Sequence, residues 1–467
     1  MKKILIRAGI SPFESMSVQE IISYNRIGLN VGNLVYLYSI YRALMVDDVE
    51  LVPTRYIIKN LDVDKINEEY SAFVIPLADA IRNSYVDSFK RLTAVVNKLK
   101  IPCHIIGVGI RAPYNYIDKG ITFDYDDVAY DFFKAILNKS PMIGVRGEIT
   151  ADYLKKIGFL PEKDFTVIGC PSFYCYGDEI KTKPLEISND MKIAFNNNVI
   201  SGGKVQKFLR RICSDYENYY YFPQRIDELK TLYLGNNYKF KSKCEGYPDT
   251  AFDELYLKDK VKFYLNVYDW LDKLSQMDLS IGPRLHGNVA AILAGTPALW
   301  IAHDARMREI IDYHNLPHIN HSDLNEDDTV SDILRKVDFE DISVGHKKRF
   351  EHYVDFLNKI GVDNIFKDYK NPELSAFDKR INETHKNIDS EVISVWKCDV
   401  AEIIRRRNLE IDMELGKKNS TDYEEELDEI AYLKKELAKT SNKLNEVKDE
   451  LKEIKKSFWY RLIRKLR

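Results

Sequence analysis

The sequence predicts an α/β protein with two units of parallel sheet, followed by a C-terminal helical coiled coil. Short apolar runs alternate with amphipathic helical stretches along roughly the first 320 residues. This alternation is typical of parallel strands that helices cover on both faces. With 467 residues, of which 45% are apolar, the chain is long enough for two or three domains with cores of their own.

The first unit is expected over residues 1–178. Its first strand, at 3–10, leads through a loop into an apolar helix at 34–44. Further strands are predicted at 72–77, 103–110, 142–147 and 165–174, and further helices at 88–100, 128–140 and 149–159. The segment 177–190 is polar and contains a proline, which is typical of a linker between domains.

The second unit is expected over residues 188–325. Strands are predicted at 191–197, 219–224, 278–282 and 298–302, and helices at 202–216, 267–277 and 288–295. The polar stretch 232–260 is interpreted as an insertion or loop within this unit. From 326 to 415 the chain becomes charged, which predicts a helical and linker region.

The C-terminal residues 420–467 carry a different pattern. Nine positions from Ile430 to Phe458 follow a strict spacing of three and four residues, and eight of them are apolar. This heptad pattern predicts a coiled coil through which the chain self-associates, although one long helix packed on the body has a similar pattern. The last residues, 455–467, combine aromatic and basic side chains, which suits either contact with an anionic membrane surface or a solvated end.

Charge and cysteine content limit the function further. The formal net charge is -3, which gives no general attraction to nucleic acid, so no nucleic-acid partner is expected. The six cysteines form no CxxC pair and no zinc pattern, so no metal site is expected. Scattered thiols, with no apolar run long enough for a membrane span or a signal peptide, predict a cytoplasmic protein.

The segment "PRLHGN" lies between a predicted strand and a predicted helix. Backbone N–H groups at a helix start favour an anion, and ligands of open α/β sheets bind at the carboxyl ends of strands. Arg284 adds a fixed charge, His286 can donate a hydrogen bond or exchange a proton, and Gly287 and Asn288 complete the loop. The segment thus predicts a phosphate or carboxylate site; the alternative is a histidine helix cap with an arginine in a surface ion pair.

Several other loops carry polar residues at the ends of predicted strands. They lie in "GLNVGNL", "GVGIRAP", "GVRGE" and "AHDARMRE". Because these loops meet at the carboxyl edges of two sheets, they predict a ligand cleft between the two units. The candidate binding residues in these loops are Asn30, Gly32, Asn33, Gly107, Gly109, Arg111, Arg146, Asp304 and Arg306.

Taken in order, these segments resemble the polysaccharide pyruvyl transferase family. The segments concerned are "NVGN", "FVIPLADAIR", "IIGVGI", "IGVRGEITADYLKKIGF", "VIGCPSF", "YYYFPQ" and "GPRLHGNVAAILAGTPALWIAHDARMRE", within residues 1–320. The last of them is the most specific. The resemblance implies two Rossmann-like domains in a GT-B-like arrangement, and transfer of the enolpyruvyl unit of phosphoenolpyruvate to two hydroxyls of one sugar.

The resemblance also implies roles for individual residues. His286 would be the donor-site residue and candidate general acid, as a protonated imidazole. Arg146 would hold the phosphate or carboxylate, whereas Arg284 would either share that role or brace its loop against Asp304. No cofactor besides the donor substrate is implied, and the acceptor would be a glycan or a lipid-linked oligosaccharide.

The chain departs from the family pattern at two places. Asn33 stands where the family's N-terminal motif has aspartate, and "GCPSF" stands where many members have Asp-Pro. Two alternatives therefore remain open. One is a GT-B glycosyltransferase that uses a nucleotide sugar, with Glu309 as a candidate ribose-binding carboxylate. The other is a non-catalytic scaffold in polysaccharide assembly.

Overall fold

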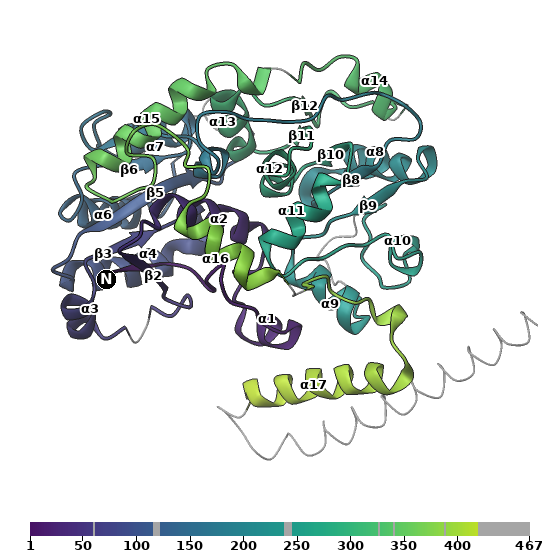
Figure 1. The fold of residues 1–467 in the computed structure, drawn as a ribbon, viewed down its shortest axis with the longest axis horizontal. Helices are drawn as coiled ribbons and strands as arrows, with labels where there is room; N and C mark the ends of the chain where they lie inside the picture. Colours follow the sequence, from purple (N-terminus) through teal and green to yellow (C-terminus); the bar gives the residue numbers. More distant parts are fainter. Residues whose placement is uncertain are drawn as a thin grey trace, which may run out of the picture. The chain divides into compact units, whose positions relative to one another are not determined.

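A computed structural model describes residues 1–58, 61–114, 122–237, 245–325, 327–339, 341–386 and 389–418 (Figure 1). Residues Met1–Val400 form one compact unit, and Ala401 begins a second. Within the second unit the described part is a helix, α17 (Val400–Lys418). The predicted coiled coil and the basic aromatic tail, 420–467, lie outside the described residues.

The first half of the larger unit is built on a parallel sheet. Its strand order is β2-β1-β3-β5-β6-β7, and β4 pairs with β5 beside this path. The strands are β1 (Lys2–Ile6), β2 (Val49–Pro53), β3 (Ala72–Ile75), β4 (Ala78–Ile81), β5 (Cys103–Ile110), β6 (Ile143–Val145) and β7 (Phe165–Val167). All eight residues of β5 are buried, as expected for a central strand covered on both faces.

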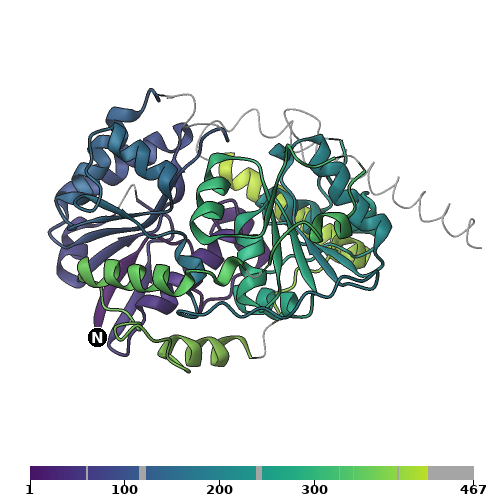
Figure 2. The same cartoon turned by 90° about the horizontal axis from the view of Figure 1, so that it is seen from above.

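Helices cover both faces of this first sheet (Figure 2). The helices of this half are α1 (Val18–Tyr24), which lies near α9 (Ile226–Leu234) of the second half rather than on the sheet (Figure 1), and α2 (Gly32–Leu44), α3 (Val63–Glu69), α4 (Val86–Lys98), α6 (Asp126–Leu137) and α7 (Glu148–Lys156). The core beneath α4 and α6 is rich in phenylalanine, and the rings of Phe89 and Phe132 stack at 4.6 Å. In α2 all residues but Asn33 are buried, so this helix is part of the core.

The second half is built on a five-stranded parallel sheet in the order β12-β11-β10-β8-β9. Its strands are β8 (Ile193–Phe195), β9 (Tyr219–Tyr221), β10 (Leu279–Gly282), β11 (Ala298–Ala302) and β12 (His318–Asn320). Its helices are α8 (Gly203–Asp215), α9 (Ile226–Leu234), α10 (Glu254–Leu257), α11 (Val267–Ser275), α12 (Leu285–Leu293), α13 (Ala305–His314) and α14 (Val330–Leu334). The predicted α/β class with two parallel sheets is confirmed.

Several predicted strands are shorter than expected, and the first strand and the one predicted at 165–174 are examples. The first ends at Ile6, and the chain then turns away from the sheet into a loop. The strand predicted at 165–174 ends at Val167, and Pro171–Tyr174 forms a 3-10 helix instead. Gly169 has a φ of 72°, outside the extended region, and Pro171 has no N–H to donate to a neighbouring strand, so the strand does not continue.

After the second sheet the chain returns to the first half. Helix α15 (His346–Lys359) lies beside α7 and β6 in Figure 1. Its His352 Nε2 lies 3.0 Å from Thr166 Oγ1 of β7. Helix α16 (Ala376–His385) supplies Asp378, whose carboxylate accepts two 2.8 Å hydrogen bonds from the buried Arg42 of α2. This return ties the charged region 326–415 to the sheet formed by the start of the chain.

The two halves also contact each other directly. Asn30 and Arg225 form an antiparallel bridge, flanked by a 2.8 Å hydrogen bond from Val31 N to Gln224 O. Glu309 of α13 accepts hydrogen bonds from Thr150 at the start of α7, at 2.9 Å from the backbone N and at 2.8 Å from Oγ1. Burial raises the pKa of Glu309 to about 8, although Thr150 and the charge of Arg146 oppose this rise.

None of the helices in the described ranges has the length and apolar composition needed to cross a membrane.

The buried carboxyl of Glu309 predicts a pH-dependent stability. Because its pKa is raised in the folded state, the folded protein holds this proton between about pH 4.5 and 8 while the unfolded chain releases it. The free energy of unfolding should therefore fall with rising pH in this window, by up to about 1.4 kcal/mol per pH unit. In Glu309→Gln the fall should be absent, as measured by urea unfolding at several pH values. The exposed Glu148→Gln is the matched control and should behave like wild type; an unchanged slope in Glu309→Gln would contradict the assignment.

Candidate functional site

A cavity of about 350 Å³ lies between the two halves and is lined by both. Its charged lining is almost entirely cationic. Three arginines come from the first half and three from the second, with one histidine and a single carboxylate. These residues are Arg82, Arg111, Arg146, Arg225, Arg284, Arg306, His286 and Asp79. We refer to this space as the arginine cavity.

The topology of the second sheet explains the position of the cavity. The strand order reverses between β8 and β10, so the connections from these two strands leave in opposite directions. A crevice forms outside the carboxyl ends of strands at such a switch point. The loop Asn196–Asn198 follows β8 and Arg284 follows β10, so the arginine cavity opens at this crevice.

The loop after β10 is fixed by asparagines. Asn196 Oδ1 accepts a 2.7 Å hydrogen bond from Arg284 N, and Asn197 O accepts one of 2.6 Å from Arg284 Nε. Asp304 instead pairs with Arg306 at 3.0 Å. The expectation that Arg284 braces its loop against Asp304 is therefore wrong, because the chain after β8 occupies that position. A surface ion pair for Arg284 is not seen among the described residues either.

Arg146 is the most deeply buried cation of the cavity, with 1% of its surface exposed. It follows β6, and its guanidinium lies over the ring of Tyr36 at 4.5 Å from the centroid. No described residue accepts a hydrogen bond from its Nε or Nη2. A buried guanidinium with free donors is costly, so the fold holds Arg146 ready for an acceptor from outside the chain.

His286 lies in the first turn of α12, next to Arg146. Its ring stacks on Tyr36 at 5.9 Å, and its Nε2 is 3.8 Å from Cys170 Sγ. Burial, followed by the charges of Arg146 and Arg306, lowers the pKa of His286 well below its usual value, with Asp79 opposing. The imidazole is therefore neutral in the free protein. The alternative of a histidine helix cap is wrong, because Arg284 occupies the cap position.

The single carboxylate of the cavity is shared among arginines. Asp79 accepts from Arg82 at 2.6 Å and from Arg306 at 3.0 Å. Burial alone would raise the pKa of Asp79, but Arg306, Arg82 and Arg111 outweigh it and hold this pKa below its usual value. One ionised carboxylate therefore faces several guanidinium groups, and a net positive charge remains.

Buried donors without an acceptor converge on this space. In native proteins such groups are rare and each calls for an explanation. Among the described residues that line the arginine cavity, the unpaired donor atoms are Arg146 Nε and Nη2, Arg284 Nη2, Arg306 Nε and Gln224 Nε2. An oxyanion with several acceptor lone pairs would satisfy them together.

Not every candidate binding residue lines the cavity. Asn288 is fully buried and clamps the loop, with its amide donating to Gly282 O at 3.0 Å and to Leu299 O at 3.1 Å. Asp304 caps α13 through Met307 N. The glycines allow close packing: a Cβ on Gly32 would lie 3.1 Å from His286 Cβ, and one on Gly287 would lie 2.2 Å from Gln224 Nε2.

Two further candidate glycines also have packing roles. A Cβ on Gly107 would lie 2.7 Å from the hydroxyl of Tyr36, and one on Gly109 would lie 3.3 Å from Arg146 Cδ. These two positions therefore allow Tyr36 and Arg146 to approach strand β5. The candidate residues that do line the cavity are Asn30, Asn33, Arg111, Arg146, Arg284, His286 and Arg306.

Sequence reasoning missed five other polar or charged lining residues, Asp79, Arg82, Asn198, Gln224 and Arg225. A signal existed for some of them, because Asp79 and Arg82 follow a predicted strand and Gln224 ends another. In the described ranges, no three His, Cys, Asp or Glu side chains gather as they would around a metal ion. The expectation that no metal is needed stays a prediction.

The family description "Polysaccharide pyruvyl transferase" matches residues 30–305, which is more than half of the chain. The chain belongs to the polysaccharide pyruvyl transferase family. It is therefore a transferase, and the family implies a polysaccharide acceptor. The matched range contains every residue of the arginine cavity except Gly28, Leu29 and Arg306.

No curated protein matches the sequence. Several solved structures are similar at low identity. S. aureus MnaA with UDP is 11% identical and aligns over 78% of this chain and 100% of its own, with a TM-score of 0.37. Acinetobacter baumannii MurG is 10% identical over 77% and 99%, with a TM-score of 0.34. Sucrose-phosphate synthase from Thermosynechococcus elongatus is 13% identical over 76% and 95%, with a TM-score of 0.36.

Asn33, where the sequence departs from the pattern expected of the family, has a structural role in this chain. Asn33 donates from its amide to Ile27 O at 3.0 Å and to Gly28 O at 3.2 Å. These bonds hold a turn in which Gly28 and Leu29 have φ of 58° and 67°. An aspartate would place a carboxylate against two carbonyl oxygens, so this turn requires the amide.

Glu309 is not positioned to bind a ribose. Its carboxylate is bonded to Thr150, and it does not line the arginine cavity. The candidate carboxylate of the glycosyltransferase alternative is thus occupied by the contact between the two halves.

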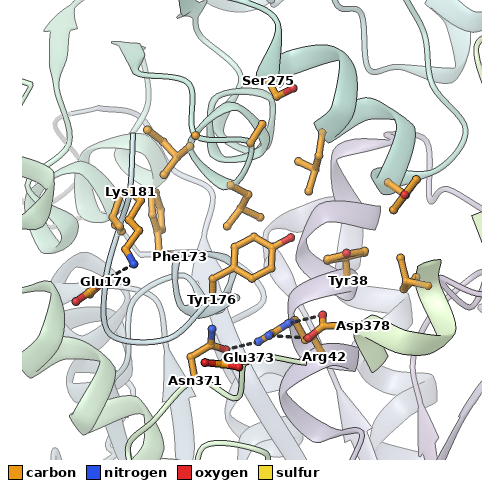
Figure 3. A pocket seen from close by; sticks show the side chains of 18 of the residues that line it. Tyr38, Arg42, Phe173, Tyr176, Glu179, Lys181, Ser275, Asn371, Glu373 and Asp378 are labelled. Atoms are coloured by element: carbon orange, nitrogen blue, oxygen red, sulfur yellow. Dashed lines mark hydrogen bonds and ion pairs between the residues drawn. The ribbon is translucent and has the colours of Figure 1, made fainter. Parts of the chain in front are cut away.

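A larger cavity of about 1030 Å³ lies elsewhere and has a different character (Figure 3). Its charged lining comprises five acidic and three basic residues, and none of the candidate site residues lines it. Arg42 is paired there with Asp378 and Asn371, and Lys181 is paired with Glu179. Because these charges are already compensated, this cavity does not suit an anionic substrate.

The turn at Asn33 gives a test of its role. We expect Asn33→Asp to lower the free energy of unfolding at pH 7 by about 1–3 kcal/mol, because two carbonyl groups lose their donor. The matched control is Asn25→Asp in the same turn, since Asn25 only needs to accept, from Leu29 N at 2.6 Å. Urea unfolding measures both variants. Equal stability of Asn33→Asp and wild type would contradict the proposed role of the amide.

Proposed function

We propose that this protein transfers the enolpyruvyl unit of phosphoenolpyruvate to two hydroxyls of one sugar, forming a pyruvate ketal on a cell-surface polysaccharide or its lipid-linked precursor. The observation that carries the proposal is the convergence of unpaired, buried guanidinium donors in the arginine cavity. Phosphoenolpyruvate carries a phosphate and a carboxylate, so a donor site for it needs several cations at short range.

The proposed reaction divides into three steps. The methylene carbon of the enol takes a proton, and the adjacent carbon becomes oxocarbenium-like. A first sugar hydroxyl attacks that carbon. Phosphate then leaves, and a second hydroxyl of the same sugar closes the ring. One ketal and one inorganic phosphate form. Of the two protons that the sugar hydroxyls lose, one makes up for the proton added to the methylene carbon and the other ends on the released phosphate.

Each cavity residue has a role in this scheme. Arg146, Arg284 and Arg306 bind the donor's anionic groups and stabilise the phosphate as it leaves. His286 is the candidate acid for the methylene carbon. Its imidazole is neutral in the free protein, but the negative charges of a bound donor would raise its pKa and favour the protonated form. Donor binding would thus prepare the acid it needs.

The proposal extends to the location of the reaction. A lipid-linked acceptor would be met at the inner face of the membrane, by a cytoplasmic protein that contacts this surface through its basic tail, 455–467. A coiled coil at 430–458, which the heptad pattern predicts, would join copies of the chain.

Replacement of Arg146 should lower the activity without lowering the stability of the fold. In Arg146→Met the donor site loses a cation, so phosphate release from phosphoenolpyruvate with a lipid-linked oligosaccharide acceptor should fall by about 10²–10³-fold. The free energy of unfolding should stay within about 1 kcal/mol of wild type or rise, because Nε and Nη2 have no internal hydrogen bond to lose and methionine can still pack on Tyr36. Arg308→Met on α13, outside the cavity, is the matched control and should retain activity.

Thermal unfolding with ligands tests the donor independently of the acceptor. Phosphoenolpyruvate should raise the melting temperature of wild type and of Arg308→Met, but not of Arg146→Met. Stabilisation by a nucleotide sugar alone, without any by phosphoenolpyruvate, would overturn the proposed function in favour of a glycosyltransferase.

The neutral His286 predicts that donor binding is coupled to proton uptake. Between the low pKa of the free imidazole and its raised pKa in the complex, binding should add a proton to this ring. Calorimetric titration of phosphoenolpyruvate near pH 6, in two buffers with different ionisation enthalpies, measures the protons taken up. Subtracting the value for His286→Gln removes the contribution of the donor's own phosphate. Equal proton uptake in the two proteins would contradict a role for His286 as the acid.

A further inference from the structure

A second cavity, of about 570 Å³, adjoins the arginine cavity and is lined by the first half alone. The two spaces share a wall. The residues that line both are Gly28, Leu29, Asn33, Ala78, Asp79 and Arg82. The second cavity is therefore adjacent to the arginine cavity. We refer to the second cavity as the tyrosine cavity, after Tyr24, Tyr36, Tyr56 and Tyr85 in its lining.

The tyrosine cavity lies at the switch point of the first sheet. There the strand order reverses between β1 and β3. Arg7 follows β1 directly, and Pro76 and Leu77 follow β3, so the carboxyl ends of both strands open into this space. The arginine cavity has the same relation to the second sheet. Each half thus places one cavity where an open α/β sheet binds its ligand.

Two cations of the tyrosine cavity have no acidic partner among the described residues. Arg7 is held by its surroundings rather than by an acid: its guanidinium lies 5.0 Å from the centroid of Tyr56 and 5.5 Å from that of Tyr85. Its Nη1 makes a 3.4 Å bond to Pro76 O, and its buried Nε has no acceptor. Arg26 likewise has a buried, unpaired Nε.

The neighbouring Arg55 provides a contrast within the same wall. Both of its terminal nitrogens pair with Glu14, so this charge is compensated inside the protein. Arg7 and Arg26 have no such acid, which leaves donors free for an anion that enters the cavity.

Backbone strain is concentrated in the same wall. Nine non-glycine residues of the described chain have a positive φ, and five of them line the tyrosine cavity. These five are Asn25, Leu29, Arg55, Tyr56 and Ala78, with φ of 49°, 67°, 59°, 58° and 37°. Such conformations cost about 1–3 kcal/mol each and cluster at ligand sites, where they hold side chains in place.

We infer that the tyrosine cavity binds the acceptor, and that it recognises an acceptor sugar bearing a phosphate or carboxylate group, which Arg7 holds. Assigning this cavity to the acceptor rests on the proposed function. The binding of an anionic sugar does not, because it depends only on the lining of the cavity. Arginines already lie over Tyr24, Tyr36, Tyr56 and Tyr85, so the rings contribute apolar surface beside convergent polar groups, which is typical of ligand pockets. The unpaired donors of Arg7 and Arg26 suit the anion.

Ligand-detected NMR titration can test this inference with three probes. α-D-Glucose 1-phosphate supplies the phosphate, D-glucuronic acid supplies the carboxylate, and D-glucose is the neutral reference. At least one anionic probe should bind more tightly than glucose, and the probe that does so identifies the anion. Arg7→Met should weaken that binding about tenfold or more, whereas Arg91→Met, on the exposed side of α4, should leave it unchanged.

A second pair of measurements distinguishes binding in the arginine cavity from binding in the tyrosine cavity. Arg146→Met should lose phosphoenolpyruvate binding and keep the anionic sugar, and Arg7→Met should show the reverse. Loss of the sugar in Arg146→Met, or unchanged sugar binding in both Arg7→Met and Arg26→Met, would overturn the inference. If wild type binds no phosphoenolpyruvate while its sugar binding depends on Arg7, the proposed function fails and the anionic-sugar site stands. Circular dichroism of each variant checks that it is folded.

Discussion

The central constraint on this molecule is the cost of burying guanidinium groups without acceptors. Arg146 is almost fully enclosed, yet two of its nitrogens have no partner among the described residues. Such a group persists only if the surrounding structure over-determines its position. The ring of Tyr36, carried on the buried helix α2, lies under it, and the glycine at 109 lets it approach β5. In the proposed function, a bound anion would supply the acceptors that these nitrogens lack.

The same chain treats its other buried arginines differently. Arg42 is as deeply buried as Arg146, but it has Asp378, Asn371 and a backbone carbonyl as acceptors. It joins α2 to α16 and to the segment around Cys175. The comparison separates two settings of one residue type: a compensated arginine holds elements together, and an uncompensated one leaves donors that the proposed function assigns to a ligand. Pairing, rather than burial, distinguishes them.

This distinction marks the limit of prediction from sequence. The loop around Arg284 and His286 could be predicted, because a strand, a short turn and a helix are local patterns that place side chains at a known edge. Asp79, Gln224 and Arg225 reach the same cavity only through contacts between distant segments, which no local pattern encodes. The alternative brace to Asp304 failed for the same reason, because Asn196 and Asn197 come from another strand. The structural role of Asn33 depends on the carbonyl oxygens of Ile27 and Gly28, which the family pattern alone does not place.

The two cavities share lining residues, so a charge bound in one affects the electrostatic environment of the other. The turn at 28–33 and the segment 78–82 face both spaces, and the turn also pairs with the second half through Asn30 and Arg225. Asp79 lies in this wall and bridges Arg82 of the first half to Arg306 of the second. Charge entering either cavity therefore changes the electrostatic environment of a carboxylate that the other cavity also contacts. Since this carboxylate is ionised and opposes the low pKa of His286, an anion held by Arg7 would act on the same balance that sets the protonation of the candidate acid.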